Sequence, residues 1–162
     1  MKYKLKEMSF NISDFNFSSK VAINDLILIN LRYKESILEF QTPKVYIHSF
    51  VKENDREYIN LKLIGTEACR IFFNKLTEFE ECISKFNTQL KLRSIFNEDS
   101  FIVKIPFKFS KPQVDIYKTN RPFNYYFLKT GMEVICLLEV QNLCLVNNEI
   151  FYHLNVKEIL II

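Results

Sequence analysis

Cations and aromatic rings are interleaved along residues 101–129, and this is the segment of the chain best equipped for binding chemistry. It holds six Lys or Arg against one acid, eight of the chain's 24 aromatic residues and three of its four prolines. Lysine and arginine bind phosphate oxygens, and aromatic rings stack on unpaired bases. The segment therefore predicts contact with single-stranded nucleic acid. A basic loop over an aromatic core is the alternative interpretation.

The sequence contains no catalytic signature. It lacks the G-x-S-x-G, Walker and H-E-x-x-H patterns, and its two glycines are too few for a phosphate-binding glycine loop. The four cysteines form no C-x-x-C pair, and the two histidines lie near none of them. His153, which lies between Tyr152 and Leu154 in the expected final strand, is interpreted as a barrel-surface or partly buried residue rather than a general base. We therefore expect no metal site, no cofactor and no enzymatic activity.

Length and composition predict one folded domain over residues 1–162. The chain is 48% hydrophobic and 25% charged, which is the balance of a globular protein. The whole chain carries a net charge of +3, whereas residues 101–129 carry six minus one, or +5. A site for a polyanion must therefore be a local patch. No leader pattern opens the chain and no apolar run reaches membrane-spanning length, so we expect no membrane partner.

Strands are predicted over most of the first half of the chain. Residues 21–31 and 36–40 are rich in branched apolar side chains, and residues 57–64 alternate between apolar and polar. Near residue 45 the alternation places Val45 and Ile47 on one side of a strand and Tyr46 on the other.

A helix is predicted at about 66–86, with Thr66 as its N-cap. Its apolar residues recur at spacings of three and four and form one stripe, in which Cys69 and Cys82 are also expected to pack. The opposite face is expected to lie in solvent and comprises Glu78, Glu80, Glu81 and Lys85.

The segment 101–109 also alternates like a strand. This places Phe101, Phe107 and Phe109 toward the core and leaves Lys104 and Lys108 outside. Pro106 within it indicates an edge strand or a bulge. Residues 110–130 are predicted to form a long loop, and loops of this length in compact domains are usually functional or mobile.

The last part of the chain predicts a long hairpin of residues 132–146 and 149–161. Asn147 and Asn148 suit its tight turn, because Asn tolerates positive φ. This turn would pair Cys144 with the region of Phe151 and Cys136 with that of Ile159. The whole pattern predicts a mainly β fold with one α-helix, as in an oligonucleotide-binding (OB) β-barrel. A β-sandwich is the alternative.

Two segments resemble a known family. The sequence QTPKVYI (Gln41–Ile47) looks like the Q-T-P-K motif of OB-fold single-stranded-DNA-binding proteins from large cytoplasmic DNA viruses, the group that includes African swine fever virus. The final segment, Gly131–Ile161, is similar to the closing hairpin of those proteins. Virus-like cytoplasmic linear plasmids of yeasts encode replication proteins with the same compositional bias.

The resemblance implies sequence-independent binding of single-stranded DNA during replication or repair, in the cytoplasm. RNA as a ligand and self-association of subunits stay open. A structural or assembly protein, which would use exposed aromatic residues and the apolar C-terminus to contact protein, is the alternative function. On this chain the phosphate contacts are assigned to Lys44, Lys104, Lys108, Lys118 and Arg121, and base stacking is assigned to Tyr46, Tyr117, Phe123, Tyr125 and Tyr126.

Overall fold

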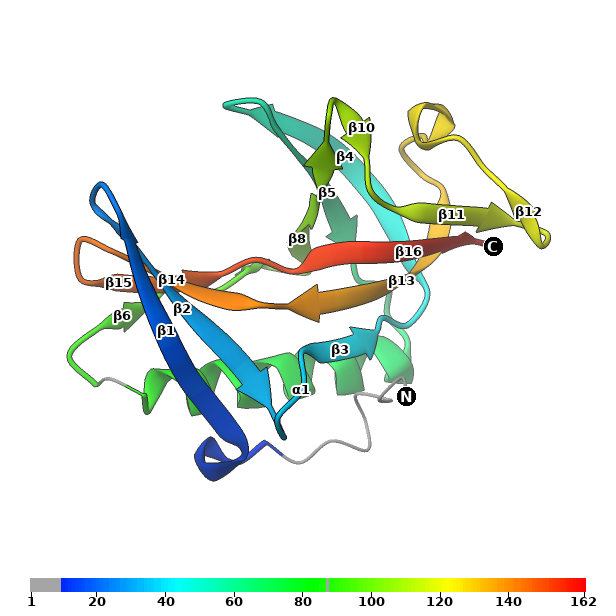
Figure 1. Cartoon of the computed structure of the whole chain (residues 1–162). Coiled ribbons are helices and arrows are strands. Elements are labelled where there is room, and N and C mark those ends of the chain that lie inside the picture. Colours follow the sequence, from blue (N-terminus) through cyan, green and yellow to red (C-terminus); the bar gives the residue numbers. More distant parts are fainter. Residues whose placement is uncertain (1–9, 87) are drawn as a thin grey trace.

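The computed structural model describes residues 10–86 and 88–162 of the chain (Figure 1). These residues form a mainly β structure with one α-helix, α1 (Glu67–Ser84). Two short 3₁₀ helices accompany it, η2 (Ile12–Asp14) and η3 (Tyr125–Phe127).

Five strands close into a β-barrel. In chain order they are β4 (Val45–Glu53), β5 (Arg56–Lys62), β8 (Ser100–Ile105), β13 (Glu133–Val140) and β16 (Asn155–Ile161). Around the barrel the order is β4-β5-β8-β16-β13, and β13 pairs with β4 again. Only the pairing of β8 with β16 is parallel. A five-stranded barrel with non-sequential strand neighbours is the OB arrangement, so the predicted OB-like barrel is confirmed.

A second sheet lies beside the barrel. It has the order β1-β2-β14-β15-β6 and comprises β1 (Phe15–Ile23), β2 (Leu26–Tyr33), β14 (Asn142–Val146), β15 (Glu149–Tyr152) and β6 (Lys91–Leu92). Strand β13 runs on into β14, and β15 runs on into β16, so one long hairpin takes part in both sheets (Figure 1).

The predicted register of this hairpin is confirmed. Asn147 and Asn148 form its turn with φ of 49° and 64°. Cys144 is paired with Phe151, and Cys136 with Ile159. Because Ile159 and Ile161 are buried, the C-terminal strand completes the barrel.

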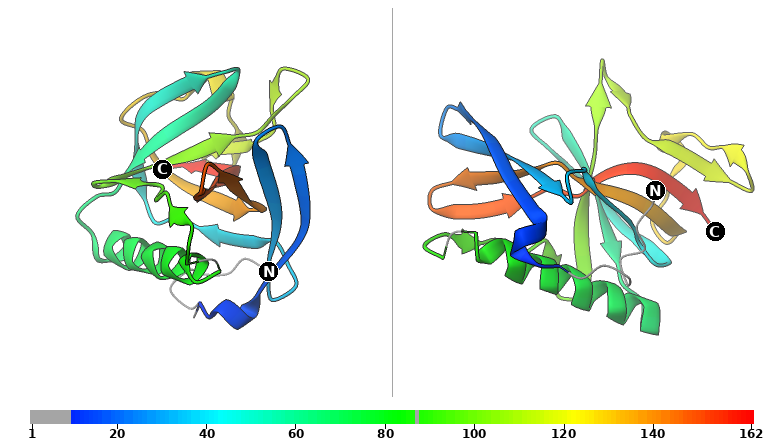
Figure 2. Two further views of the ribbon diagram at one scale, coloured as in Figure 1. Left: turned by 90° about the vertical axis from the view of Figure 1, so that its left-hand side faces the viewer. Right: turned by 60° about the horizontal axis from the view of Figure 1, so that its bottom comes forward.

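Helix α1 packs on both sheets, and Figure 2 shows it crossing beneath them. The Thr66 hydroxyl accepts a hydrogen bond from the Cys69 backbone N–H at 3.2 Å, as the predicted N-cap requires. The Phe72 ring lies 5.3 Å from that of Phe101 in the barrel, and the Phe79 ring lies 5.2 Å from that of Tyr152 in the second sheet. The predicted apolar stripe therefore joins the two sheets through one core.

Glu80 is not in solvent as predicted. It is buried, with an exposed fraction of 8%, and lies beside the apolar stripe of α1. Its carboxylate accepts hydrogen bonds from the Tyr152 hydroxyl at 2.8 Å, the Ser94 hydroxyl at 2.9 Å and the Ile95 backbone N–H at 3.1 Å. A buried carboxylate needs such partners. These partners lie outside α1, so the periodicity of the helix sequence cannot predict that Glu80 is buried.

The β-structure predicted for residues 21–31 is present, but a turn at Asn24 and Asp25 divides the segment between β1 and β2. Asn24 has a φ of 54°, a left-handed conformation that Asn adopts readily.

The predicted long loop at 110–130 is wrong. It contains β11 (Asp115–Lys118), which pairs with β16 in parallel, and β12 (Arg121–Pro122), which pairs with β11. The remaining short strands are β3 (Leu38–Gln41), β7 (Phe96–Asn97), β9 (Phe107–Lys108) and β10 (Lys111–Pro112). Strands of two to four residues carry little periodicity of their own, and β11 and β3 also depend on distant partners, β16 and β13.

The burial predicted for Phe109 is wrong as well. Strand β8 ends at Ile105, before Pro106, so the alternation that buries Phe101 and Val103 does not continue. Phe107 is half-buried against the core, whereas Phe109 lies in the turn between β9 and β10 and is 88% exposed. Proline lacks the backbone donor that would extend the ladder, which explains the break.

Candidate functional site

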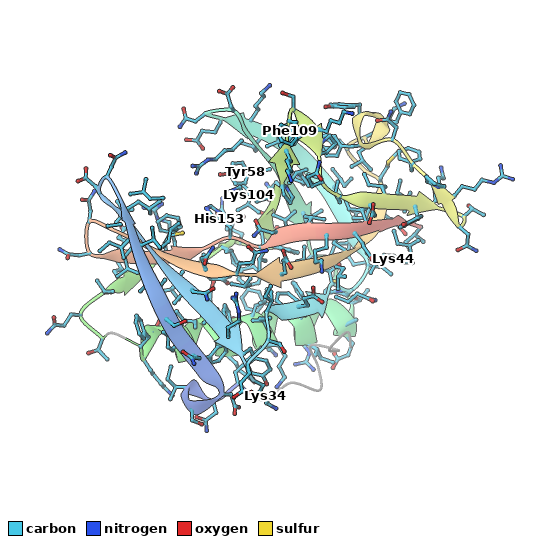
Figure 3. All side chains as sticks on the ribbon, viewed as in Figure 1. Lys34, Lys44, Tyr58, Lys104, Phe109 and His153 are labelled. Carbon is cyan, nitrogen blue, oxygen red and sulfur yellow. The ribbon has the colours of Figure 1, made fainter. Side chains whose placement is uncertain are left out.

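A cleft opens between the β4–β5 hairpin and the β14–β15 hairpin. Figure 3 shows Tyr58, Lys104 and His153 close together in this opening. Two cavities of about 350 Å³ and about 370 Å³ lie there, and Arg56 lines both. Strands β5 and β8 form the floor, where Tyr58 and Lys104 are directly paired.

Two cations of the cleft have no counter-charge in contact with them among residues 10–86 and 88–162. Arg56 follows the turn at the tip of the β4–β5 hairpin, and Lys104 lies in β8, where its backbone N–H donates to the Leu154 carbonyl at 2.8 Å. Neither side chain forms a hydrogen bond or ion pair with any residue of 10–86 or 88–162. Burial and the nearby Arg56 lower the pKa of Lys104. A phosphate at this position would relieve the repulsion between the two cations.

Three carboxylates also line these cavities, and they do not pair with Arg56 or Lys104. Glu139 is engaged by Gln141 at 2.5 Å and by Lys157 at 3.8 Å. Glu53 and Asp55 are exposed at the tip of the β4–β5 hairpin.

Three rings follow one another along the cleft. The Tyr58 and His153 ring centroids are 6.0 Å apart, and those of His153 and Phe151 are 5.7 Å apart. The Arg93 guanidinium lies 5.4 Å from the Phe151 ring centroid and forms an ion pair with Glu149. All three rings are half-buried, so they are held in place and still present a surface to solvent. Such a series can stack with flat unsaturated ligands.

His153 is held neutral by its surroundings. Burial, Lys104 and Arg56 lower the pKa of His153 to about 4 from its ordinary value of 6.5. At neutral pH the imidazole therefore adds an uncharged aromatic surface to the cleft and no further positive charge.

We expect His153 to make the stability of the protein depend on pH. Between about pH 6.5 and pH 4 the unfolded chain protonates this residue while the folded chain does not, so the free energy of unfolding falls as the pH falls. Replacing His153 with Gln should flatten this part of the profile. Urea denaturation of both proteins at pH 7.5, 6.5, 5.5 and 4.5 measures the difference, and parallel profiles would contradict the assignment.

Of the residues predicted from sequence, Lys104 lies in this cleft, and Lys108 lies on the adjoining β9–β10 hairpin. Lys44 lies well away from Lys104 in Figure 3. It forms an ion pair with Glu133 at 3.6 Å, and the Tyr46 hydroxyl donates to the same carboxylate at 2.7 Å. The hydrogen bond and charge of Glu133 raise the pKa of Tyr46. Both side chains therefore already have an acidic partner.

The other predicted residues lie on the β11–β12 hairpin and beside η3. Tyr117, Lys118 and Arg121 are exposed on the hairpin, and the order β11-β16-β13-β4 puts two strands between them and Tyr46.

The three predicted stacking residues near η3 (Phe123, Tyr125 and Tyr126) differ in how far they are buried. Phe123 packs against the core, whereas Tyr126 is 64% exposed. The Tyr125 hydroxyl donates to Glu57 at 2.7 Å, and burial raises the pKa of this tyrosine.

Sequence reasoning did not identify Arg56, Tyr58, Phe151 and His153 as one site. Tyr58 and Lys104 face each other only because β5 pairs with β8 across the inserted helix. His153 joins them because β16 closes the barrel against β8. The available signal was the strand alternation, which correctly separated Lys104 from the buried Phe101 and Val103.

The chain matches no protein-family model and no curated protein sequence. The site must therefore be interpreted from its own geometry. Within the described residues, no group of three or more His, Cys, Asp or Glu side chains could hold a metal ion. In the same part of the chain, no helix is both long and apolar enough to cross a membrane.

Proposed function

We propose that this chain binds single-stranded DNA in the cleft between the β4–β5 and β14–β15 hairpins. The observation that carries the proposal is the juxtaposition of two cations, Arg56 and Lys104, which have no ion-pair partner among the described residues, with the ring series Tyr58, His153 and Phe151. The cations would contact phosphates and the rings would stack on bases.

The geometry favours a single strand over a duplex. Stacking requires a free base face, which paired and stacked bases inside a duplex do not offer to a protein ring. Contacts to phosphates and ring faces are common to every nucleotide, so this mode of binding depends little on sequence. RNA offers the same groups, and it is the competing ligand.

A fold-level analogy supports the same location. In OB barrels, oligonucleotides bind across the second and third strands and the loops after the first and fourth strands. Here these are β5, β8, the β4–β5 turn and the β14–β15 hairpin. The analogy concerns position and does not by itself establish function. With the Q-T-P-K resemblance, it leads us to propose a role in protecting single strands during replication or repair in the cytoplasm.

We expect fluorescence anisotropy with labelled oligo(dT) to show binding that weakens as salt is added. For a single strand, log K falls by about 0.7 per log unit of salt for each phosphate contacted, so the two cleft cations alone contribute about −1.4 to the slope. An oligo(U) of equal length tests the preference for DNA. Absence of binding at low salt would overturn the proposal.

A protein-assembly module is the second candidate, and the exposed apolar tip of the β1–β2 hairpin favours it. Val21 and Ile23 are each 51% exposed and Ile27 is 38% exposed, at an edge of the second sheet. A second copy of the chain could pair along this edge. Light scattering that shows a dimer, together with no binding of oligo(dT), would favour this candidate.

A further inference from the structure

The β9–β10 hairpin forms a short finger that ends in Phe109. Figure 2 shows the finger projecting away from the barrel, and Figure 3 places Phe109 at its end. At 88%, Phe109 is the most exposed large apolar side chain among the described residues. An aromatic ring presented in this way contributes little to the core.

The turn of the finger has an unfavourable sequence for its conformation. Phe109 and Ser110 have φ of 50° and 60°, in the left-handed region that Asn and Gly prefer and that bulky residues avoid. Three of the four other turns with two such residues in the described chain contain Asn: Asn54–Asp55, Thr119–Asn120 and Asn147–Asn148. Placing Phe at this turn therefore sacrifices local stability.

The base of the turn is also unfavourable. Lys108 and Lys111 are directly opposite each other in the register of β9 and β10, and like charges at such positions repel. The Lys108 ammonium lies 5.5 Å from the Phe109 ring centroid. Neither lysine forms an ion pair within the described residues. An anion bound between the lysines would remove the repulsion.

The finger adjoins the cleft. It begins at Pro106, directly after β8, and Pro106 and Phe107 line the same cavity as Arg56 and Lys104. A strand bound to Lys104 could therefore continue toward the finger. Two features that destabilise the free protein, the positive φ of Phe109 and the opposed lysines Lys108 and Lys111, therefore occur together beside the proposed site.

We propose that the finger is a second base-stacking site. The Phe109 ring stacks on a base of the strand as it leaves the cleft, and Lys108 and Lys111 contact the flanking phosphates. This inference rests on the proposed function of the cleft and extends the bound strand beyond the barrel.

The decisive variant combines Phe109→Asn with Ser110→Gly, which installs the pair that this turn prefers. The variant should melt at the same or a higher temperature than the wild-type chain and bind oligo(dT) at least about fivefold more weakly, the lower end for loss of one base stack. Phe109→Tyr should retain binding. A purely structural Phe109 would instead give a less stable variant with unchanged affinity, and that result overturns the inference.

A position-specific signal comes from Phe109→Trp, because the chain contains no tryptophan. Oligo(dT) should quench the fluorescence of this variant, and should leave unchanged that of Ile162→Trp, whose side chain is 53% exposed at the end of the chain. If the wild-type chain binds oligo(dT) but the fluorescence of Phe109→Trp is not quenched, the proposed stacking site on the finger is contradicted and the proposed function of the cleft is not. If the wild-type chain does not bind oligo(dT), both proposals are contradicted.

Discussion

Replacing Arg56 and Lys104 together with alanine is expected to weaken oligo(dT) binding by about a hundredfold or more. A hydrogen bond to a charged group is worth about 1.5–3 kcal/mol, so two lost phosphate contacts amount to at least about 3 kcal/mol. Since about 1.4 kcal/mol corresponds to a tenfold change, the affinity falls by two orders of magnitude. Anisotropy titration at constant salt measures the effect.

This double variant should remain folded, because the change removes a repulsion and breaks no ion pair within the described residues. Its thermal midpoint should therefore match that of the wild-type chain.

The matched control is Lys118→Ala with Arg121→Ala. It removes the same charge from the β11–β12 hairpin, which sequence reasoning also assigned to DNA binding. We expect the control to change the affinity by less than about threefold. If the control weakens binding as much as the cleft variant does, the effect is one of general charge, and the assignment of the binding site to the cleft is contradicted.

Replacing Glu80 with alanine is expected to lower the free energy of unfolding by about 2 kcal/mol or more. The change leaves two buried donors, the Tyr152 hydroxyl and the Ile95 backbone N–H, without their acceptor, whereas the hydroxyl of the exposed Ser94 can bond to water instead. Each buried polar group without a partner costs about 1–3 kcal/mol. Urea denaturation monitored by circular dichroism measures the loss.

Glu81→Ala provides the comparison, because Glu81 is the next residue of α1 and is exposed. Surface substitutions of this kind usually change stability by less than about 0.5 kcal/mol. If the two variants are equally stable, the hydrogen bonds of Glu80 do not hold α1 to β15. Because Tyr152 lies between Phe151 and His153 in sequence, the same network also fixes the ring series of the cleft.

The fold could be predicted where local chemistry decides it. The Thr66 cap and the apolar spacing defined α1, and the Asn147–Asn148 turn determined the pairing of Cys136 with Ile159. Prediction failed where a contact between residues far apart in the chain decides the structure. Strand β11 forms because it pairs with β16, and Glu80 can be buried because Ser94 and Tyr152 donate hydrogen bonds to its carboxylate.

The site could be predicted only in part for the same reason. Alternation within one strand correctly turned Lys104 away from the core. No local pattern places Tyr58 opposite Lys104, because the helix separates their strands in the chain. The abundant lysines and aromatic residues in 101–129 predicted that most partners of Lys104 in the site would be its neighbours in sequence. Its neighbours in space instead come from β5 and from the β15–β16 segment.

The long hairpin that takes part in both sheets has a consequence for the thermodynamics of binding. The β14–β15 end that walls the cleft is paired with β2 and β6 and is continuous with two barrel strands, so it cannot close over a ligand as a free loop would. The groove is therefore preorganised. In the proposed complex with single-stranded DNA, most of the conformational entropy lost on association would be lost by the nucleic acid. A flexible pyrimidine strand suits such a groove better than a purine strand that must first break its own stacking.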